Sequence, residues 1–421
     1  MSDCKPCTTP IDTSSKGKST MNDPEANAPP KNETEEQLRQ ATKKMLKSVI
    51  SLAQTFIAIA TSILTAAFSV RKDVNLHRHV LMAGGCFLVI AYLSALVLVY
   101  LKLFLSEHRQ LHMWHIRFIQ LLCVTSGAAL IATNSLLLVL ISEGNGLLSL
   151  NLLPIQGIVG MLAYLATPTE DSMRDEVFEA GIKSGRKVAL FATATAFAVQ
   201  ATLVFGYFNN SSFRALGHRF DISVSFLASA LSVFLVVATC MPLGYRTEAA
   251  RDKVLSIVRY LKDAVIAMLA VTAVTLGKEF LGGDTVLALV PETTVAAMYY
   301  AVALFSDEKA AAQDQRDAAE HKMEMLPTAV VATFGFGMLG AAYATLLGTG
   351  EYDLYTKALV LTLLAAVVSS LGRVAGPLSG SRRDKNVATW VVFLGNILPI
   401  VEMLVAVPLA ADVVINILPV S

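Results

Sequence analysis

Eleven apolar runs, each close to the length that crosses a lipid bilayer as a helix, constrain this chain most strongly. About 20 apolar residues are needed for one helical span. The runs are continuous rather than alternating in polarity, so they predict helices and not barrel strands. We therefore predict an all-α polytopic membrane protein. The predicted spans are 47–70, 80–101, 117–141, 147–167, 187–208, 220–244, 257–277, 284–305, 326–349, 354–376 and 387–409, the last of which stays apolar to about 416.

The overall composition agrees with lipid as the main solvent of the chain. Hydrophobic residues make up 54% and charged residues 16%, whereas a soluble domain carries roughly 25% charged residues. The 34 basic and 33 acidic residues nearly cancel, which argues against a nucleic-acid partner. The same composition excludes a disordered chain and a disulfide-rich secreted module. The expected partner is the bilayer, and we expect no cofactor.

The orientation of the spans follows from the basic residues in the short connections. Most Lys and Arg residues fall in one alternating set of connections, which predicts that this set faces the cytosol. The N-terminus would then be cytosolic and the C-terminus outside or in the lumen. The first hairpin is the exception, because Arg71, Lys72 and Arg78 lie on the opposite side.

The first 40 residues differ from the rest of the chain. They are rich in Ser, Thr, Lys, Pro and Asn and lack the large apolar residues that a folded core requires. We expect 1–40 to be a disordered cytosolic tail and 41–421 to be the transmembrane domain. Cys4 and Cys7 form a CxxC pair without two further ligands nearby, so they are interpreted as free thiols. Whether Asn209 or Asn210 is glycosylated stays open.

The predicted spans are arranged as hairpins, and two of them resemble each other. Small turns at Gly146, Gly283 and Gly350 join the spans on the predicted outer side. The sequence around Pro154 in the fourth span matches that around Pro291 in the eighth. The preceding spans fall near the same offset, which suggests two parallel four-helix units.

Ionisable side chains inside a span are costly, and are functional candidates for that reason. Glu292 directly follows Pro291, Glu402 lies three residues after Pro399, and Gln156 is the uncharged counterpart in the fourth span. A proline frees one helix carbonyl to face a ligand. If the last span ends near 409, both carboxylates lie roughly 10–12 Å below the outer edge. The candidate solute or ion site comprises Glu292, Glu402 and Gln156, with helix breaks at Pro154, Pro291 and Pro399.

The remaining ionisable groups are interpreted as structural. We expect Lys262 to extend towards the cytosolic face and Asp263 to pair with Arg259 one turn earlier. Three histidines share one helical face, but interfacial histidines explain this spacing better than a metal site does. These are His108, His112 and His115.

A literal GxGxxG motif spans Gly335–Gly340, in the middle of a predicted transmembrane run. No strand precedes it, so a nucleotide site is not expected. Glycines inside a membrane helix instead allow close approach of a neighbouring helix.

Two acidic motifs raise an enzymatic alternative. Asp171 and Asp175 form a DxxxD, and Asp314 and Asp317 form a DxxD four spans later. In these short motifs alone the chain resembles membrane prenyltransferases, which hold magnesium diphosphates between two such motifs. The flanking residues and the second spacing depart from that pattern. Charged extensions of helices explain both motifs better, so we do not expect an enzyme.

Two functions remain after these exclusions. The first is transport of a small solute or ion, coupled through the intramembrane carboxylates. The second is a non-transporting adaptor or organiser that binds partners through its cytosolic loops and tail. A polar cavity at the carboxylates favours transport, and a tightly packed interior favours the adaptor. Substrate, oligomeric state and the particular membrane are not readable from these residues.

Overall fold

The computed structural model describes ten segments of the chain, which are 53–61, 63, 78–107, 113–141, 175–209, 219–240, 248–305, 325–346, 352–375 and 389–417. Contacts divide the chain into Met1–Met45 and Leu46–Ser421, and all described residues belong to the second unit. The predicted tail 1–40 and the predicted span 147–167 therefore lie outside the described residues.

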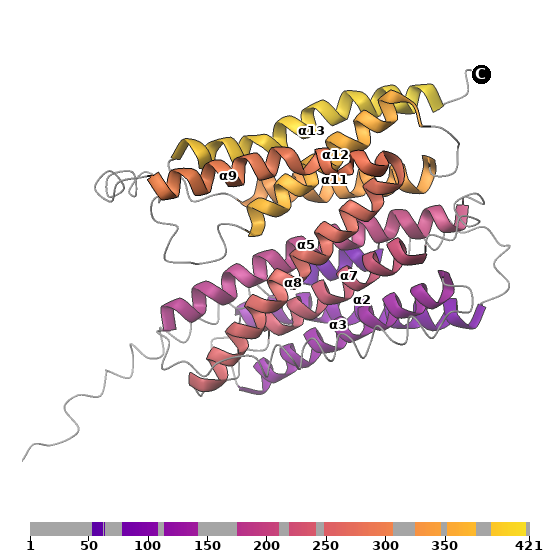
Figure 1. Cartoon of the computed structure of the whole chain (residues 1–421). Helices are drawn as coiled ribbons and strands as arrows, with labels where there is room; N and C mark the ends of the chain where they lie inside the picture. Colours follow the sequence, from indigo (N-terminus) through magenta and orange to yellow (C-terminus); the bar gives the residue numbers. More distant parts are fainter. Residues whose placement is uncertain are drawn as a thin grey trace, which may run out of the picture. The chain divides into compact units, whose positions relative to one another are not determined.

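Within the described segments all regular structure is helical and no strand occurs (Figure 1). The α-helices are α2 (Arg78–Glu107), α3 (Met113–Ile141), α5 (Asp175–Asn209), α7 (Arg219–Cys240), α8 (Glu248–Leu281), α9 (Val290–Phe305), α11 (Met325–Leu346), α12 (Leu354–Ala375) and α13 (Thr389–Ile417), and one 3₁₀-helix, η3 (Gly282–Leu289), joins α8 to α9.

Eight helical segments in the described part are long and apolar enough to cross a membrane. This supports a multi-pass membrane protein, while the predicted number of eleven spans stays a prediction. One segment, Lys253–Met298, has 46 residues. A helix of this length would extend about 69 Å, more than twice the roughly 30 Å hydrocarbon core. The segment therefore has to make two passes, in agreement with the predicted spans 257–277 and 284–305.

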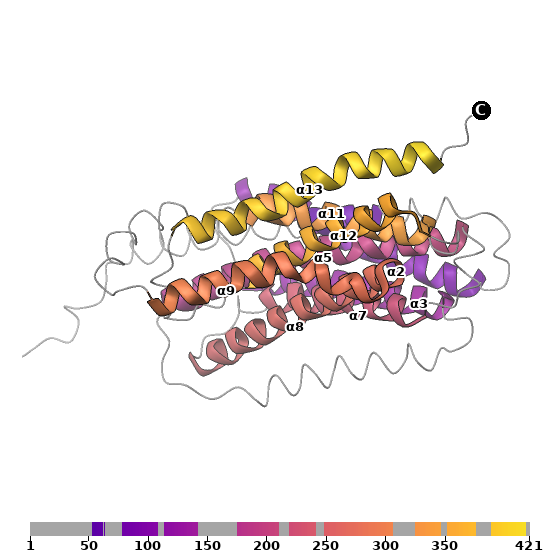
Figure 2. The same cartoon turned by 45° about the horizontal axis from the view of Figure 1, so that its top comes forward.

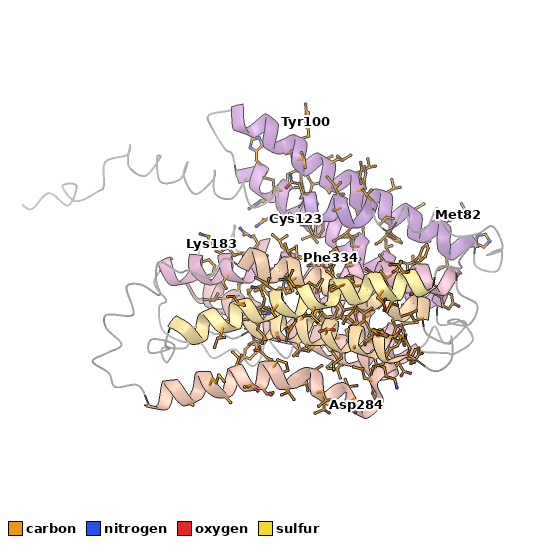
Figure 3. All side chains as sticks on the ribbon, turned by 90° about the horizontal axis from the view of Figure 1, so that it is seen from above. Met82, Tyr100, Cys123, Lys183, Asp284 and Phe334 are labelled. Atoms are coloured by element: carbon orange, nitrogen blue, oxygen red, sulfur yellow. The ribbon has the colours of Figure 1, made fainter. Side chains whose placement is uncertain are left out.

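A glycine turn separates these two passes. Gly282 has φ +56°, a left-handed conformation that glycine adopts without the steric cost of a Cβ. The chain reverses its direction at this turn, and α8 and α9 both extend from it to the same side (Figures 1 and 2). Asp284 lies at the turn, at the end of the straight segment formed by η3 and α9 (Figure 3). Gly283, predicted to mark this outer turn, lies beside Gly282 in η3.

The helices pack in a series, each against its neighbours in space. Helix α2 packs on α3, α3 on α7, and α7 on α5 and α8. Helix α5 packs on α11, which contacts α12, and α12 contacts α13 and η3. The spans of α7 and α5 are the most buried, while those of α2 and α13 are the least buried. Helices α2 and α13 are therefore connected mainly through the central helices that lie between them.

The most exposed helices present large apolar side chains. On α2, Leu93 and Tyr100 are exposed, and on α13 the same is true of Leu404 and Ile415. In water such a surface would be a strong aggregation hazard. Most of the buried polar residues lie on the helices between α2 and α13, including Thr195 on α5. Apolar side chains outside and polar ones inside match a chain surrounded by lipid.

The GxGxxG motif lies on α11 at contacts between helices. A Cβ at Gly340 would overlap Thr202 of α5, and a Cβ at Gly335 would lie 3.0 Å from Val367 of α12. Nothing lies within 4 Å at Gly337. Two of the three glycines therefore permit close packing of α11 against α5 and α12, as their position inside a span predicts.

Candidate functional site

Two carboxylates from different helices lie against the end of α12. The Ser369 hydroxyl donates a hydrogen bond to Oε1 of Glu402 on α13, at 3.3 Å. The Glu292 side chain of α9 lies so close to Gly372 that a Cβ at this position would overlap its carboxylate. Ser369 and Gly372 are three residues apart, so they share one face of α12. Glycine at position 372 makes room for Glu292, and the two glutamates interact electrostatically.

The irregular helix before Glu292 determines where this carboxylate lies. The 3₁₀-helix η3 extends over eight residues, whereas runs longer than three or four residues are uncommon and often mark a hinge. The Val290 N–H still donates to the Leu287 carbonyl in the 3₁₀ pattern. Pro291 follows and has no N–H to donate. Glu292 is thus in the first turn of α9, directly after the change of helix type.

Arg373 is the cation of the site. Its guanidinium interacts electrostatically with the Glu292 carboxylate. On its other side it lies directly against Gly395 of α13, where no Cβ could be accommodated. Pro399 lacks the N–H that would otherwise bond to the carbonyl of residue 395, four positions earlier. The guanidinium, which has five N–H donors, therefore lies beside the position where the α13 hydrogen-bond ladder is interrupted.

Both glutamates keep an oxygen atom without a partner. Glu402 is 8% exposed, and Glu292 is half-buried. Within the part of the chain that the structure describes, Oε2 of each glutamate is buried and makes no hydrogen bond. A buried polar atom without a partner costs free energy, and the cost is larger for a charged group. Such an atom in a membrane span is the feature expected of a group that receives a ligand or a proton.

The two carboxylates lie farther from the ends of their helical segments than predicted. Helix α13 continues as one helix to Ile417, through Pro399 and Pro408, so the assumed end near 409 was wrong. Pro399 removes one hydrogen bond from this helix without ending it. At 1.5 Å per residue, Glu402 lies about 22 Å from the end of α13. Because a 3₁₀-helix rises about 2 Å per residue, Glu292 lies about 19 Å from Gly282. The two distances still match, and both groups are near the middle of their helical segments.

The structure thus brings together four of the six residues singled out in the sequence, namely Glu292, Pro291, Glu402 and Pro399. Gln156 and Pro154 lie outside the described residues. The α12 contribution was not predicted, because Arg373 lies near the end of the predicted span 354–376, where a basic residue is normally explained by the cytosolic surface. The α12 residues that sequence reasoning missed are Ser369, Gly372 and Arg373. A Ser-Ser pair followed by Gly-Arg within a predicted span was the available signal.

A second buried polar cluster joins α3, α5 and α7. The Asn134 side-chain amide donates to the Phe226 carbonyl at 2.8 Å. The Gln200 amide donates to Oδ1 of Asn134, and the Ser229 hydroxyl donates to Oε1 of Gln200 at 2.9 Å. Asn134, Gln200 and Ser229 are each at most 4% exposed. This cluster is neutral, and each of its three side chains has a partner on another helix.

The other ionisable candidates do not join either cluster. Lys262 is buried at 5% exposure and pairs with Asp263 at 3.6 Å. Asp263 therefore pairs with its neighbour in sequence, and the expected pairing with Arg259 was wrong. Lys262 is also buried rather than extended to the surface. In the described residues no three His, Cys, Asp or Glu side chains lie close enough to hold a metal ion.

An apolar groove of about 660 Å³ lies between α5 and α11. The Thr195 and Thr333 hydroxyls are hydrogen-bonded to each other across these two helices, at 3.0 Å. The groove is lined by aromatic and small residues, which include Phe191, Ala194, Ala198, Phe334, Gly337 and Ala341. None of the carboxylates lies in its lining. This groove is therefore separate from the site on α12.

Comparison of the chain with protein-family models, with characterised proteins and with solved structures finds no significant match.

Proposed function

We propose that this chain is a membrane transporter of a small solute or ion, with Glu292 and Glu402 as the coupling groups. The observation that carries the proposal is the pair of buried, unpartnered Oε2 atoms on one face of α12. Charged side chains inside a span are rare, and where they occur they mark ion pathways and proton relays. Two of them, from helices far apart in sequence, supply negative charge where a cation can bind.

Irregular helices at the same place support the proposal. Binding sites of transporters are commonly built from interrupted helices near the middle of the bilayer. Here Glu292 follows the 3₁₀-helix η3, and Glu402 follows Pro399, which removes a hydrogen bond from α13. A regular helix has all its carbonyls bonded within itself, so an interruption is what makes backbone groups available to a ligand.

The proposal includes the topology predicted from the chain. It has about eleven spans arranged as hairpins, a cytosolic N-terminus and a C-terminus outside or in the lumen. The two parallel four-helix units and Gln156, in the predicted fourth span, belong to the same proposal. We propose no catalytic reaction.

A second candidate function is a non-transporting adaptor or organiser. The neutral cluster of Asn134, Gln200 and Ser229 favours this second function. The cluster holds three helices together through hydrogen bonds and leaves no open site. The groove between α5 and α11 is apolar and also offers no polar path. An adaptor of this kind would carry no flux.

Flux measurements on the full-length chain in liposomes separate the two functions. Uptake of protons, sodium and potassium is compared for the wild type, Glu292→Gln and Glu402→Gln. Asp284→Asn is the matched control, since it makes the same acid-to-amide change at an exposed side chain beside the Gly282 turn. We expect flux in the wild type and the control, and at least a tenfold loss in both Gln variants. Equal flux in all four proteins, or none in the wild type, would overturn the proposal.

A further inference from the structure

The charges at the α12 site do not cancel. Glu292 and Glu402 contribute two negative charges when ionised, and Arg373 contributes one positive charge. Among the described residues, Arg373 is the charged group that acts on Glu292, and Glu292 is the one that acts on Glu402. Counted over the described residues, these three groups carry a net charge of −1 when both carboxylates are ionised. A net charge inside a membrane span is unfavourable unless a partner balances it, and one positive charge would balance this one.

The positive charge of Arg373 belongs permanently to the protein. A guanidinium is not deprotonated in proteins, so Arg373 cannot release a proton as a glutamic acid can. Its side chain lies directly against Gly395 of α13 and acts electrostatically on Glu292 of α9. It is therefore placed to hold Glu292 whenever that carboxylate is ionised. Protonation of Glu292 removes this attraction.

The oxygen atoms that are available at the site also favour a single small charge. Ser369 already donates to Oε1 of Glu402, which leaves the Oε2 atoms of the two glutamates without a partner. Calcium takes six to eight oxygen ligands, and magnesium six in a strict octahedron. A proton requires one carboxylate oxygen and can be shared between two.

We infer that the α12 site takes up one positive charge per cycle, as a proton on the Glu292–Glu402 pair, and that Arg373 is the positioning residue that sets this number. In the binding step a proton from solution forms an O–H bond with one carboxylate, and release breaks the same bond. The other positive charge that two carboxylates would require is already present as Arg373. This inference rests on the proposed function, since it names the charge that the carboxylates carry.

Infrared spectroscopy of the purified full-length protein tests the inference, because a protonated carboxylic acid has its own C=O band. The band is followed from pH 9 to pH 5, and its growth in the Glu292→Gln, Glu402→Gln double variant is subtracted. We expect one protonated carboxyl group per wild-type chain and one in Arg373→Lys, which keeps the charge. Arg373→Gln, which removes it, should take up two.

Three results would overturn the inference. They are two protons in the wild type, one proton in Arg373→Gln, and a wild-type band that calcium suppresses. Suppression of the wild-type band by sodium, but not by a bulky organic cation, would also overturn the assignment of the charge to a proton, because an alkali ion would then occupy the site. If Arg373→Gln does not fold, the wild-type and Arg373→Lys counts still decide between one proton and two.

The result is independent of the flux experiment. One proton without flux would support the charge count and refute transport. Flux with two protons per chain would support transport and refute the role of Arg373.

Discussion

Two buried polar clusters in this chain are built in opposite ways. On α3, α5 and α7, the Asn134, Gln200 and Ser229 side chains are neutral and bond to one another. On α9, α12 and α13, Glu292 and Glu402 are ionisable, and each leaves one buried oxygen without a partner. A satisfied neutral cluster stabilises helix packing, whereas unsatisfied charged atoms reduce stability. The second cluster therefore calls for a functional explanation that the first does not.

The helices that carry the two clusters differ in the same sense. The α-helices α3, α5 and α7 run without an interruption at the neutral cluster. The charged cluster lies beside an eight-residue 3₁₀-helix and a buried proline. Both interruptions make helix geometry less stable than a regular α-helix would be. The regular helices therefore carry the neutral cluster. The irregular helices carry the charged cluster, in which one oxygen of each glutamate has no hydrogen-bond partner.

The largest expected effect is at the charged cluster, where a substitution should reduce flux without reducing thermal stability. Glu402→Gln should reduce flux at least tenfold, because it removes a coupling charge. Its thermal midpoint in detergent should stay the same or rise, since an amide loses less free energy on burial than a carboxylate does. A variant that unfolds at lower temperature and keeps its flux would mean that Glu402 serves packing alone.

At the neutral cluster the opposite pattern is expected. Gln200→Leu keeps the approximate volume but removes the partner of Asn134 and Ser229. The free energy of unfolding should fall by about 1–2 kcal/mol, because the buried partners lose their hydrogen bonds. Denaturant titration of the detergent-solubilised protein measures this change. Flux per folded molecule should not change, and a loss as large as that of Glu402→Gln would remove the distinction between the clusters.

Gly372→Ala should disturb the site by crowding Glu292. A Cβ at this position overlaps the carboxylate, and overpacking of this kind costs about 1–3 kcal/mol. We expect a severalfold loss of flux. Gly337→Ala is the matched control, since α11 has nothing within 4 Å at that glycine. Equal effects of the two substitutions on flux would show that Glu292 can move away without consequence.

The smallest effect concerns the exposed start of α12, outside both clusters. The Thr356 hydroxyl and N–H donate to the Asp353 carboxylate, the latter at 2.8 Å, and lower its pKa below the ordinary value. This cap contributes stability above the unfolded-state pKa, and the contribution is lost as pH falls through the lowered folded-state pKa. Hydrogen exchange in the first turn of α12 should therefore show a pH-dependent protection that Asp353→Asn lacks. Identical pH profiles would contradict the assignment.

Much of the architecture could be predicted from local sequence. Apolar runs such as 117–141 are long enough to predict a span by themselves, and the structure has helices there. Glu292 and Glu402 could be singled out for the same reason, because a charge within an apolar run is visible without knowledge of its neighbours. The end of α13 was harder to predict, since the apolar run continues past Pro408 and a proline in a membrane helix need not end it.

The α12 contribution could not be predicted in this way. Arg373 is near the end of its span, where a basic residue is normally explained by the cytosolic surface. Its role depends on the contact with α13 and α9, which are distant in sequence. The neutral cluster escaped notice for a related reason, since Asn134 and Gln200 carry no charge that would make them conspicuous among apolar residues.

The sequence by itself determined that lipid surrounds most of this chain, that its helices cross the bilayer, and that two glutamates are within those helices. These properties depend on length, hydropathy and charge along single segments. Only the tertiary structure decided that Glu292 and Glu402 meet at α12, with Arg373 beside Glu292 and Ser369 bonded to Glu402. The physical reason is that contacts between helices depend on which faces pack together, and side chains far apart in sequence supply those faces.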